Sequence, residues 1–171
     1  MQRIKELIRD VPDFPKPGIV FKDLTPVFRD SAAMLKISSE LALPFRNTHV
    51  TAVAGMEARG FIFGSLVARE LDVGFIPLRK PGKLPAETHS VSYALEYGEA
   101  SLEMHTDAVT AQDHVLLVDD LLATGGTAAA SIKLINEVGA EICGAVFFVE
   151  LDFLHGRKML GDVSVHSLVH F

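Results

Sequence analysis

The fold of this chain is decided by one stretch, Val115-Leu116-Leu117-Val118-Asp119-Asp120-Leu121-Leu122-Ala123-Thr124-Gly125-Gly126-Thr127. Its four leading apolar residues are too few and too β-branched for a helix, and they predict a buried strand. Two carboxylates follow where we expect that strand to end, and a short turn then closes on Thr-Gly-Gly-Thr. Apolar residues next recur at the spacing of one helix face, at Ala128, Ile132, Ile135 and Val138, before Gly139 stops the helix. The stretch therefore predicts a strand, a loop of small residues and a helix.

The loop has the parts that an anion site needs. Gly125 and Gly126 let the backbone adopt angles that a side chain forbids, so consecutive amides can point into one concavity. The helix start adds partial positive charge, and Thr124 and Thr127 add hydroxyl donors. The loop lacks the lysine of a Walker motif and the G-x-G-x-x-G spacing of dinucleotide folds. The pattern therefore predicts a phosphate-binding loop of another kind.

Asp119 and Asp120 narrow the choice of ligand. Paired carboxylates would repel a bare phosphate, but they suit a phosphate followed by a diol, with a metal ion screening the charge. A purely structural interpretation, in which the glycines tighten a turn and the acids face solvent, explains neither the two acids nor the two threonines. The whole stretch resembles the phosphoribosyl pyrophosphate signature of type I phosphoribosyltransferases, with strand, Asp-Asp and Thr-Gly-Gly-Thr in register.

Composition limits the class of protein. The chain has 171 residues, which suggests one domain, and a net charge of −6 with both signs spread along it. This charge argues against a general nucleic-acid or membrane binder. The single cysteine, Cys143, lies in an apolar run and fits a reducing compartment. Because no apolar run is long enough to span a membrane and the N-terminus has no secretory h-region, we expect a cytoplasmic protein.

Strands alternate with helices along the rest of the chain. Strands are predicted over Val50–Ala54, Val73–Leu78, Ala100–His105, Ile142–Val149 and Val163–Val169, and helices over residues 2–10, Met34–Phe45 (capped by Asp30 or Ser31), Phe61–Leu71 and a turn at 154–160. This alternation predicts an α/β domain with a mainly parallel sheet flanked by helices. Such sheets bind ligands at the carboxyl ends of their strands, where the candidate loops lie.

Local cations stand out on this acidic chain. Arg59 at a helix start is badly placed for the helix dipole, which makes sense if it faces an anionic ligand. Arg79, Lys80 and Lys83 surround a Pro-Gly turn; they form either an ordinary solvated loop or a site for more phosphate. Residues 86–98, polar and aromatic, indicate a mobile hairpin or lid rather than a core element.

The N-terminal segment contains three prolines between positions 12 and 17, which stiffen the chain and predict irregular structure. A rigid loop that carries Val20 and Phe21 could form one side of a binding site for a flat aromatic ligand. From composition alone, an ordinary surface loop anchored by core residues is the better interpretation.

Four further stretches, in order and spacing, resemble the adenine-specific members of the type I phosphoribosyltransferase family. They are Asp13–Phe21, Ala58–Phe61, Arg79–Pro85 and Leu95–Gly98. The resemblance covers nearly the whole chain and implies one domain, 1–171, with the family fold. It also implies an N-terminal hood (residues 1–28) over the base and a mobile lid loop (residues 79–98). This resemblance overturns the surface-loop interpretation.

The resemblance implies a role for the hood in base recognition. The backbone at Val20 and Lys22 would read the edge of adenine, while Phe21 and Leu151 sandwich its ring. Many relatives have arginine where this chain has Lys22, a change that a backbone contact should tolerate.

The reaction implied is adenine plus phosphoribosyl pyrophosphate giving AMP and pyrophosphate, with Mg²⁺ bound mainly through the pyrophosphate and in part by Asp119 and Asp120. The 5′-phosphate would be held by Ala123, Thr124, Gly125, Gly126 and Thr127, the ribose hydroxyls by Asp119 and Asp120, and the pyrophosphate by Arg59, Arg79, Lys80 and Lys83. Glu96, with Tyr97 beside it, is the candidate general acid/base. The family further implies a cis peptide between Glu57 and Ala58 and a homodimer, with no nucleic-acid or membrane partner.

Two alternatives remain open from the sequence. A transferase for hypoxanthine, xanthine or orotate would need a lysine or acid side chain reading a 6-oxo group, which the Val20–Lys22 segment does not offer. A non-catalytic regulator that binds phosphoribosyl pyrophosphate should carry an added nucleic-acid-binding segment, for which the chain has neither the length nor a basic face.

Overall fold

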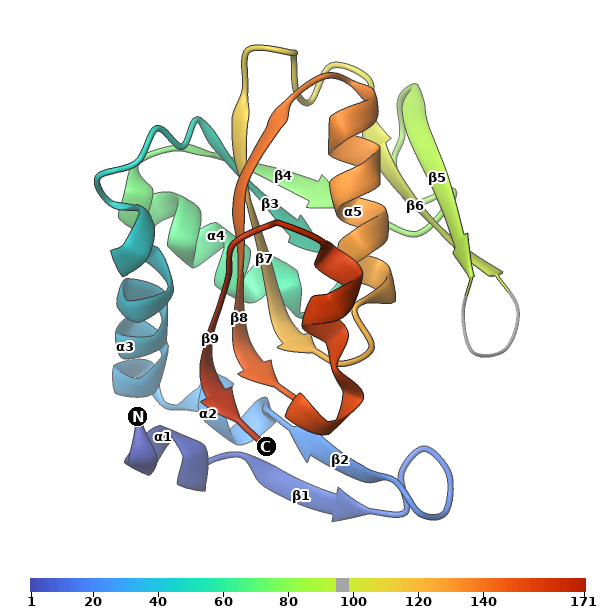
Figure 1. The fold of residues 1–171 in the computed structure, drawn as a ribbon. Coiled ribbons are helices and arrows are strands. Elements are labelled where there is room, and N and C mark those ends of the chain that lie inside the picture. Colours follow the sequence, from blue (N-terminus) through green and yellow to red (C-terminus); the bar gives the residue numbers. More distant parts are fainter. Residues whose placement is uncertain (95–98) are drawn as a thin grey trace.

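A single parallel sheet forms the centre of the molecule (Figure 1). The computed structural model describes residues 1–94 and 99–171. The sheet order is β4 (Gly74–Leu78), β3 (Ala52–Met56), β7 (His114–Leu122), β8 (Glu141–Glu150) and β9 (Val165–His170). Each neighbouring pair is parallel. The predicted α/β class and parallel sheet are confirmed.

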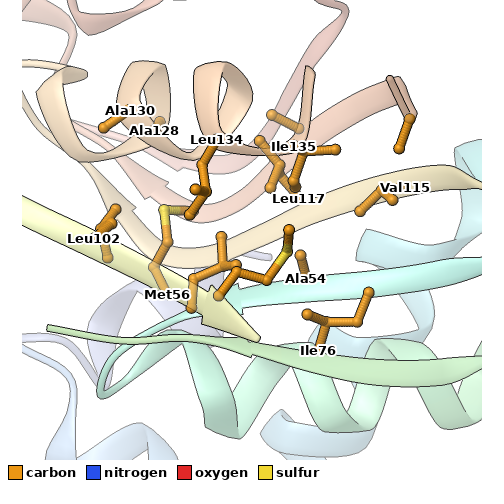
Figure 2. Close-up of a cluster of buried hydrophobic side chains, with 14 of the residues drawn as sticks. Ala54, Met56, Ile76, Leu102, Val115, Leu117, Ala128, Ala130, Leu134 and Ile135 are labelled. Atoms are coloured by element: carbon orange, nitrogen blue, oxygen red, sulfur yellow. The ribbon is translucent and has the colours of Figure 1, made fainter. Parts of the chain in front are cut away.

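Two hydrophobic clusters lie on opposite faces of this sheet. Helices α3 (Ser31–Ala42) and α4 (Gly60–Leu71) cover one face; α5 (Gly126–Glu137) covers the other. Figure 2 shows Leu117 of β7 among the side chains of the α5 cluster, whereas its neighbour Leu116 belongs to the α4 cluster. Because β7 is buried on both faces, its sequence reads as a continuous apolar run rather than an alternating one.

Strand β7 is longer than the sequence analysis expected. It continues through Asp119 and Asp120 to Leu122, pairing with β8 as far as Glu150. The acids therefore lie within the strand near its carboxyl end, not after it. Adjacent residues of a strand start out towards opposite faces, but the two carboxylates remain close enough for the charge of Asp120 to raise the pKa of Asp119.

The N-terminal region differs from the prediction of one helix and an irregular loop. Helix α1 ends at Glu6 (Gln2–Glu6), and β1 (Arg9–Pro12) pairs antiparallel with β2 (Val20–Asp23). Pro12 is tolerated because it ends a strand of a two-stranded ribbon. A short α2 (Thr25–Arg29) follows. In Figure 1 this hairpin lies beyond the arrowheads of β8 and β9, at the carboxyl edge of the sheet.

Shorter elements complete the connections. The Asp30 side chain caps α3 by accepting from the Ala33 N–H at 2.9 Å, as predicted. Pro44 stands in a 3₁₀ turn, η1 (Leu43–Phe45), which follows α3. The helical turn predicted after β8 is two 3₁₀ turns, η2 (Asp152–Leu154) and η3 (Gly156–Leu160).

The predicted lid contains a packed hairpin. Strands β5 (Thr88–Ala94) and β6 (Glu99–His105) pair antiparallel. Val91 and Leu102 are buried in the α5 cluster, so the expectation that this segment lacks core residues is wrong for Val91. Among the helices that the structure describes, none combines the length and apolar character needed to cross a membrane.

Candidate active site

The loop Ala123–Thr127 joins β7 to α5 and surrounds a cavity of about 80 Å³, lined also by Asp119 and Phe147. Gly125 has a φ of +84°, a left-handed value that favours glycine. Helix α5 begins at the next residue, so its free N–H groups and its positive dipole end lie at the cavity. The predicted phosphate loop thus has the form of an anion site.

A second glycine, Gly156 of η3, supports this loop from behind. A Cβ at Gly156 would lie 2.2 Å from the Ala123 carbonyl oxygen, and a Cβ at Gly125 would lie 2.3 Å from the Gly156 carbonyl oxygen. Two backbones meet here because both residues lack side chains. Sequence reasoning missed Gly156, whose only signal was a glycine in an irregular segment.

The two acids have different environments. Asp119 lines the cavity, whereas Asp120 is 4% exposed and forms an ion pair with the Arg59 guanidinium. Burial and then the neighbouring Asp120 charge raise the pKa of Asp119 well above its usual value, although the charge of Arg59 opposes them. The two acids share one predicted role in ribose binding, but only Asp119 lines the phosphate cavity.

Gly60 makes the approach of α4 to this strand possible. A Cβ at Gly60 would lie 2.6 Å from Asp119 Oδ1 and 3.1 Å from the Val118 carbonyl oxygen. The glycine of the Ala-Arg-Gly-Phe stretch is therefore needed for close packing, which lets Arg59 reach Asp120.

Arg59 connects the acids to the hood. Its guanidinium carbon lies 5.5 Å from the centroid of the Phe21 ring, while its Nε donates to Asp120. Phe14 packs edge-on against Phe21, with ring centroids 5.2 Å apart. One side chain thus brings a predicted base-stacking residue and a predicted ribose-binding acid into a single site.

The side chain of Lys22 contacts Asp10 and Phe171. Its Nζ donates to Asp10 at 2.7 Å and lies 3.9 Å from the centroid of the Phe171 ring. Val20 of the same strand is 52% exposed. Leu151 follows β8, half-buried, and its N–H donates to the Leu122 carbonyl at 3.0 Å. The hood and Leu151 are therefore both at the carboxyl edge of the sheet.

The basic loop is attached through Glu57, which sequence reasoning also missed. Glu57 accepts from Arg79 Nε at 2.9 Å and from the Lys80 N–H at 3.2 Å. Arg79 Nη1 also donates to the Lys83 carbonyl at 3.0 Å, and the side chains of Lys80 and Lys83 belong to exposed residues. The predicted cis peptide between Glu57 and Ala58 is present. Arg79 is thus held beside the loop that follows β3.

The predicted acid/base pair, Glu96 and Tyr97, lies outside the described residues. Among the described residues, the hydroxyl of Tyr93 on β5 lies 3.2 Å from Thr127 Oγ1. The lid hairpin is therefore linked directly to the phosphate loop.

Comparisons with known proteins agree with this geometry. A family model described as a phosphoribosyl transferase domain matches residues 24–166. The adenine phosphoribosyltransferase of Nitrosococcus oceani is 61% identical over 171 residues, covering 100% of both chains. The crystal structure of adenine phosphoribosyltransferase from Thermoanaerobacter pseudethanolicus is 50% identical, with 99% of each chain covered and a TM-score of 0.96. The Saccharomyces cerevisiae enzyme, crystallised with adenine and an imino-altritol bisphosphate, is 38% identical, with 98% of this chain and 97% of that one covered and a TM-score of 0.92.

Proposed function

Because the chain belongs to the type I phosphoribosyltransferase family, and within it to the adenine phosphoribosyltransferases, we propose a role for each part of its site in making AMP. The enzyme transfers the 5-phosphoribosyl group from phosphoribosyl pyrophosphate to adenine and releases pyrophosphate, a reaction of purine salvage. The observation that supports the assignment best is Arg59, which contacts Asp120 on one side and the Phe21 ring on the other.

The phosphate loop Ala123–Thr127 holds the 5′-phosphate on its amides and on the hydroxyls of Thr124 and Thr127. The cavity and the start of α5 support this role. Asp119 and Asp120 bind the ribose hydroxyls. Asp119 does so from the cavity side, and Asp120 does so while Arg59 neutralises its charge.

The pyrophosphate is bound by cations around the carboxyl edge. Arg59, Arg79, Lys80 and Lys83 place positive charge there, which favours departure of the pyrophosphate as charge develops on it. Arg79 is oriented by Glu57. The donor set fits Mg²⁺, because Asp119 offers carboxylate oxygens at the cavity, and such oxygens are the ligands that Mg²⁺ prefers. When bound with the substrate, Mg²⁺ would neutralise part of the pyrophosphate charge.

Adenine lies between Phe21 and Leu151, and the backbone of Val20 and Lys22 reads its edge. The engagement of the Lys22 side chain with Asp10 and Phe171 supports a backbone role, because that side chain is already bound elsewhere. Glu96, assisted by Tyr97, moves the proton at the base nitrogen. We also propose a homodimer in the cytoplasm.

A direct assay tests this function. Purified protein is mixed with adenine, phosphoribosyl pyrophosphate and Mg²⁺, and AMP and pyrophosphate are measured. Hypoxanthine, guanine and orotate are assayed in parallel. Stoichiometric AMP and pyrophosphate from adenine supports the proposal. Turnover of another base alone, or binding of phosphoribosyl pyrophosphate without any turnover, would replace it with one of the two alternatives.

A further inference from the structure

The segment from Leu151 to Leu160 touches both ends of the site. The Leu151 N–H donates to Leu122, the last residue of β7, and Gly156 lies against Ala123 and Gly125 of the phosphate loop. Figure 1 shows η3 beside the beginning of α5. Because η3 supports the loop from behind, displacement of its backbone would displace the amides that face the phosphate.

Arg157 anchors this segment immediately after Gly156. Its Nε donates to Glu150 Oε1 at 2.6 Å and its Nη2 to Glu150 Oε2 at 2.7 Å, a two-point contact that only a guanidinium can make. The Glu150 side chain is 5% exposed. Arg157 Nη1 also donates to the Val165 carbonyl of β9 at 2.8 Å. One side chain therefore attaches η3 to the neighbouring strands β8 and β9.

The charges of this pair reinforce the anchor. Burial tends to raise the pKa of Glu150, but hydrogen bonds from Arg157 and Ser167 and the Arg157 charge outweigh it, so the pKa is lowered overall. The hydrogen bond to Glu150 raises the pKa of Arg157. Both groups stay charged at neutral pH, and loss of Arg157 would leave the buried Glu150 carboxylate without its charged partner.

We propose that Arg157 is a positioning residue for the phosphate loop: clamped to Glu150, it holds Gly156 against Ala123 and Gly125 and so fixes the amides that bind the 5′-phosphate. This inference rests on the proposed function of the loop. Arg157 acts through the backbone of Gly156, so a substitution of Arg157 affects the binding of phosphate-bearing ligands.

The test is Arg157→Lys, which keeps the charge and loses the two-point contact. Its matched control is Arg46→Lys. Arg46 also forms an ion pair with a glutamate, Glu70, at an N–O distance of 2.7 Å, and neither residue belongs to the proposed site. Ribose 5-phosphate and phosphoribosyl pyrophosphate affinities are measured by calorimetry, together with KM for each substrate and the melting temperature. Arg157→Lys should weaken both phosphate ligands by roughly 10- to 100-fold, as expected for misplacement on an ångström scale. KM for adenine should change far less, and Arg46→Lys should leave both affinities unchanged.

A purely structural role predicts a different result. The melting temperature of Arg157→Lys would then fall while the folded variant bound ribose 5-phosphate like the wild type, and this result would overturn the proposal. Glu150→Gln gives the same readout if Arg157→Lys does not fold. The two proposals fail in different ways. A wild-type chain that binds ribose 5-phosphate but makes no AMP would refute the proposed reaction. The ratio of variant to wild-type affinity for ribose 5-phosphate would still support or overturn the role of Arg157.

Discussion

At the scale of single residues, the clearest feature is the unequal state of two neighbouring carboxylates. Asp120 has Arg59 as its partner, whereas Asp119 has a raised pKa because burial and the Asp120 charge disfavour its ionised form. A folded-state pKa above the unfolded value means that this group's contribution to stability falls as pH rises from the unfolded pKa, about 3.9, towards the folded value. The fold thus disfavours ionisation of Asp119 at the place where we propose that a ligand binds.

Asp119→Asn should therefore stabilise the ligand-free enzyme and impair substrate binding. The amide cannot ionise, so its advantage in melting temperature over the wild type should be small near pH 4 and larger at pH 8. Affinity for phosphoribosyl pyrophosphate should fall, and fall further in the Asp119→Asn, Asp120→Asn double variant. Calorimetry with Mg²⁺ present measures both properties. A lower melting temperature than wild type at pH 8, or unchanged affinity of the double variant, would contradict these assignments.

Gly125→Ala should cost more stability than its backbone angle alone explains. Gly18 has a φ of +86° and Gly125 one of +84°, so alanine suffers similar strain at both, of about 1–2 kcal/mol. A Cβ at Gly18 meets nothing within 4 Å, whereas one at Gly125 would lie 2.3 Å from the Gly156 carbonyl oxygen. Urea unfolding should show a larger loss for Gly125→Ala than for Gly18→Ala. Equal losses would mean that η3 moves away freely.

At the scale of elements, the sequence predicted what depends on local patterns. The buried strands, α4 and α5 follow from apolar runs and periodicity, and the phosphate loop follows from its glycines and threonines. Patterns failed where pairing partners decide structure: Arg9–Pro12 became a strand because it pairs with Val20–Asp23, and Val91 became a core residue because β5 packs on α5. Glu57 and Gly156 act only through residues distant in sequence, so no local motif identified them.

Glu96, which follows β5 in the sequence, is the proposed acid/base group, and Glu96→Gln tests this role. The glutamine keeps the shape and one hydrogen bond but cannot exchange a proton. Single-turnover rates should fall by about 10²- to 10⁴-fold, with little change in binding of phosphoribosyl pyrophosphate. Tyr93→Phe is the comparison variant. It removes the hydroxyl that lies 3.2 Å from Thr127 Oγ1, and so changes the contact between β5 and the phosphate loop while leaving Glu96 in place. An unchanged single-turnover rate of Glu96→Gln from pH 5 to 9 would assign the proton transfer to solvent or to a backbone group.

At the scale of the whole molecule, the two ends of the chain meet beside the proposed base-binding segment. The C-terminal Phe171 lies under the Lys22 ammonium, and its N–H donates to the Glu150 carbonyl at 3.0 Å. The hood is thereby connected to the end of β8, from which Leu151 follows directly. Figure 1 shows the C-terminus beside the N-terminal elements. The base pocket that we propose would therefore depend on contacts between the first and last parts of the sequence.

This arrangement predicts strong selection of adenine. In the proposed site, backbone groups at Val20 and Lys22 offer a fixed pattern of donors and acceptors. The 6-oxo group of hypoxanthine would then leave buried groups unpaired, at a cost of about 10⁴-fold or more in kcat/KM. Lys22→Arg should keep this selectivity, because arginine can still pair with Asp10 and lie over Phe171. Lys22→Ala should loosen the strand and weaken selection against hypoxanthine, while ribose 5-phosphate, which lacks a base, should bind as before. The kcat/KM ratio of the two bases measures the effect in each variant. Comparable turnover of hypoxanthine by the wild type would show that the hood does not read the base through its backbone.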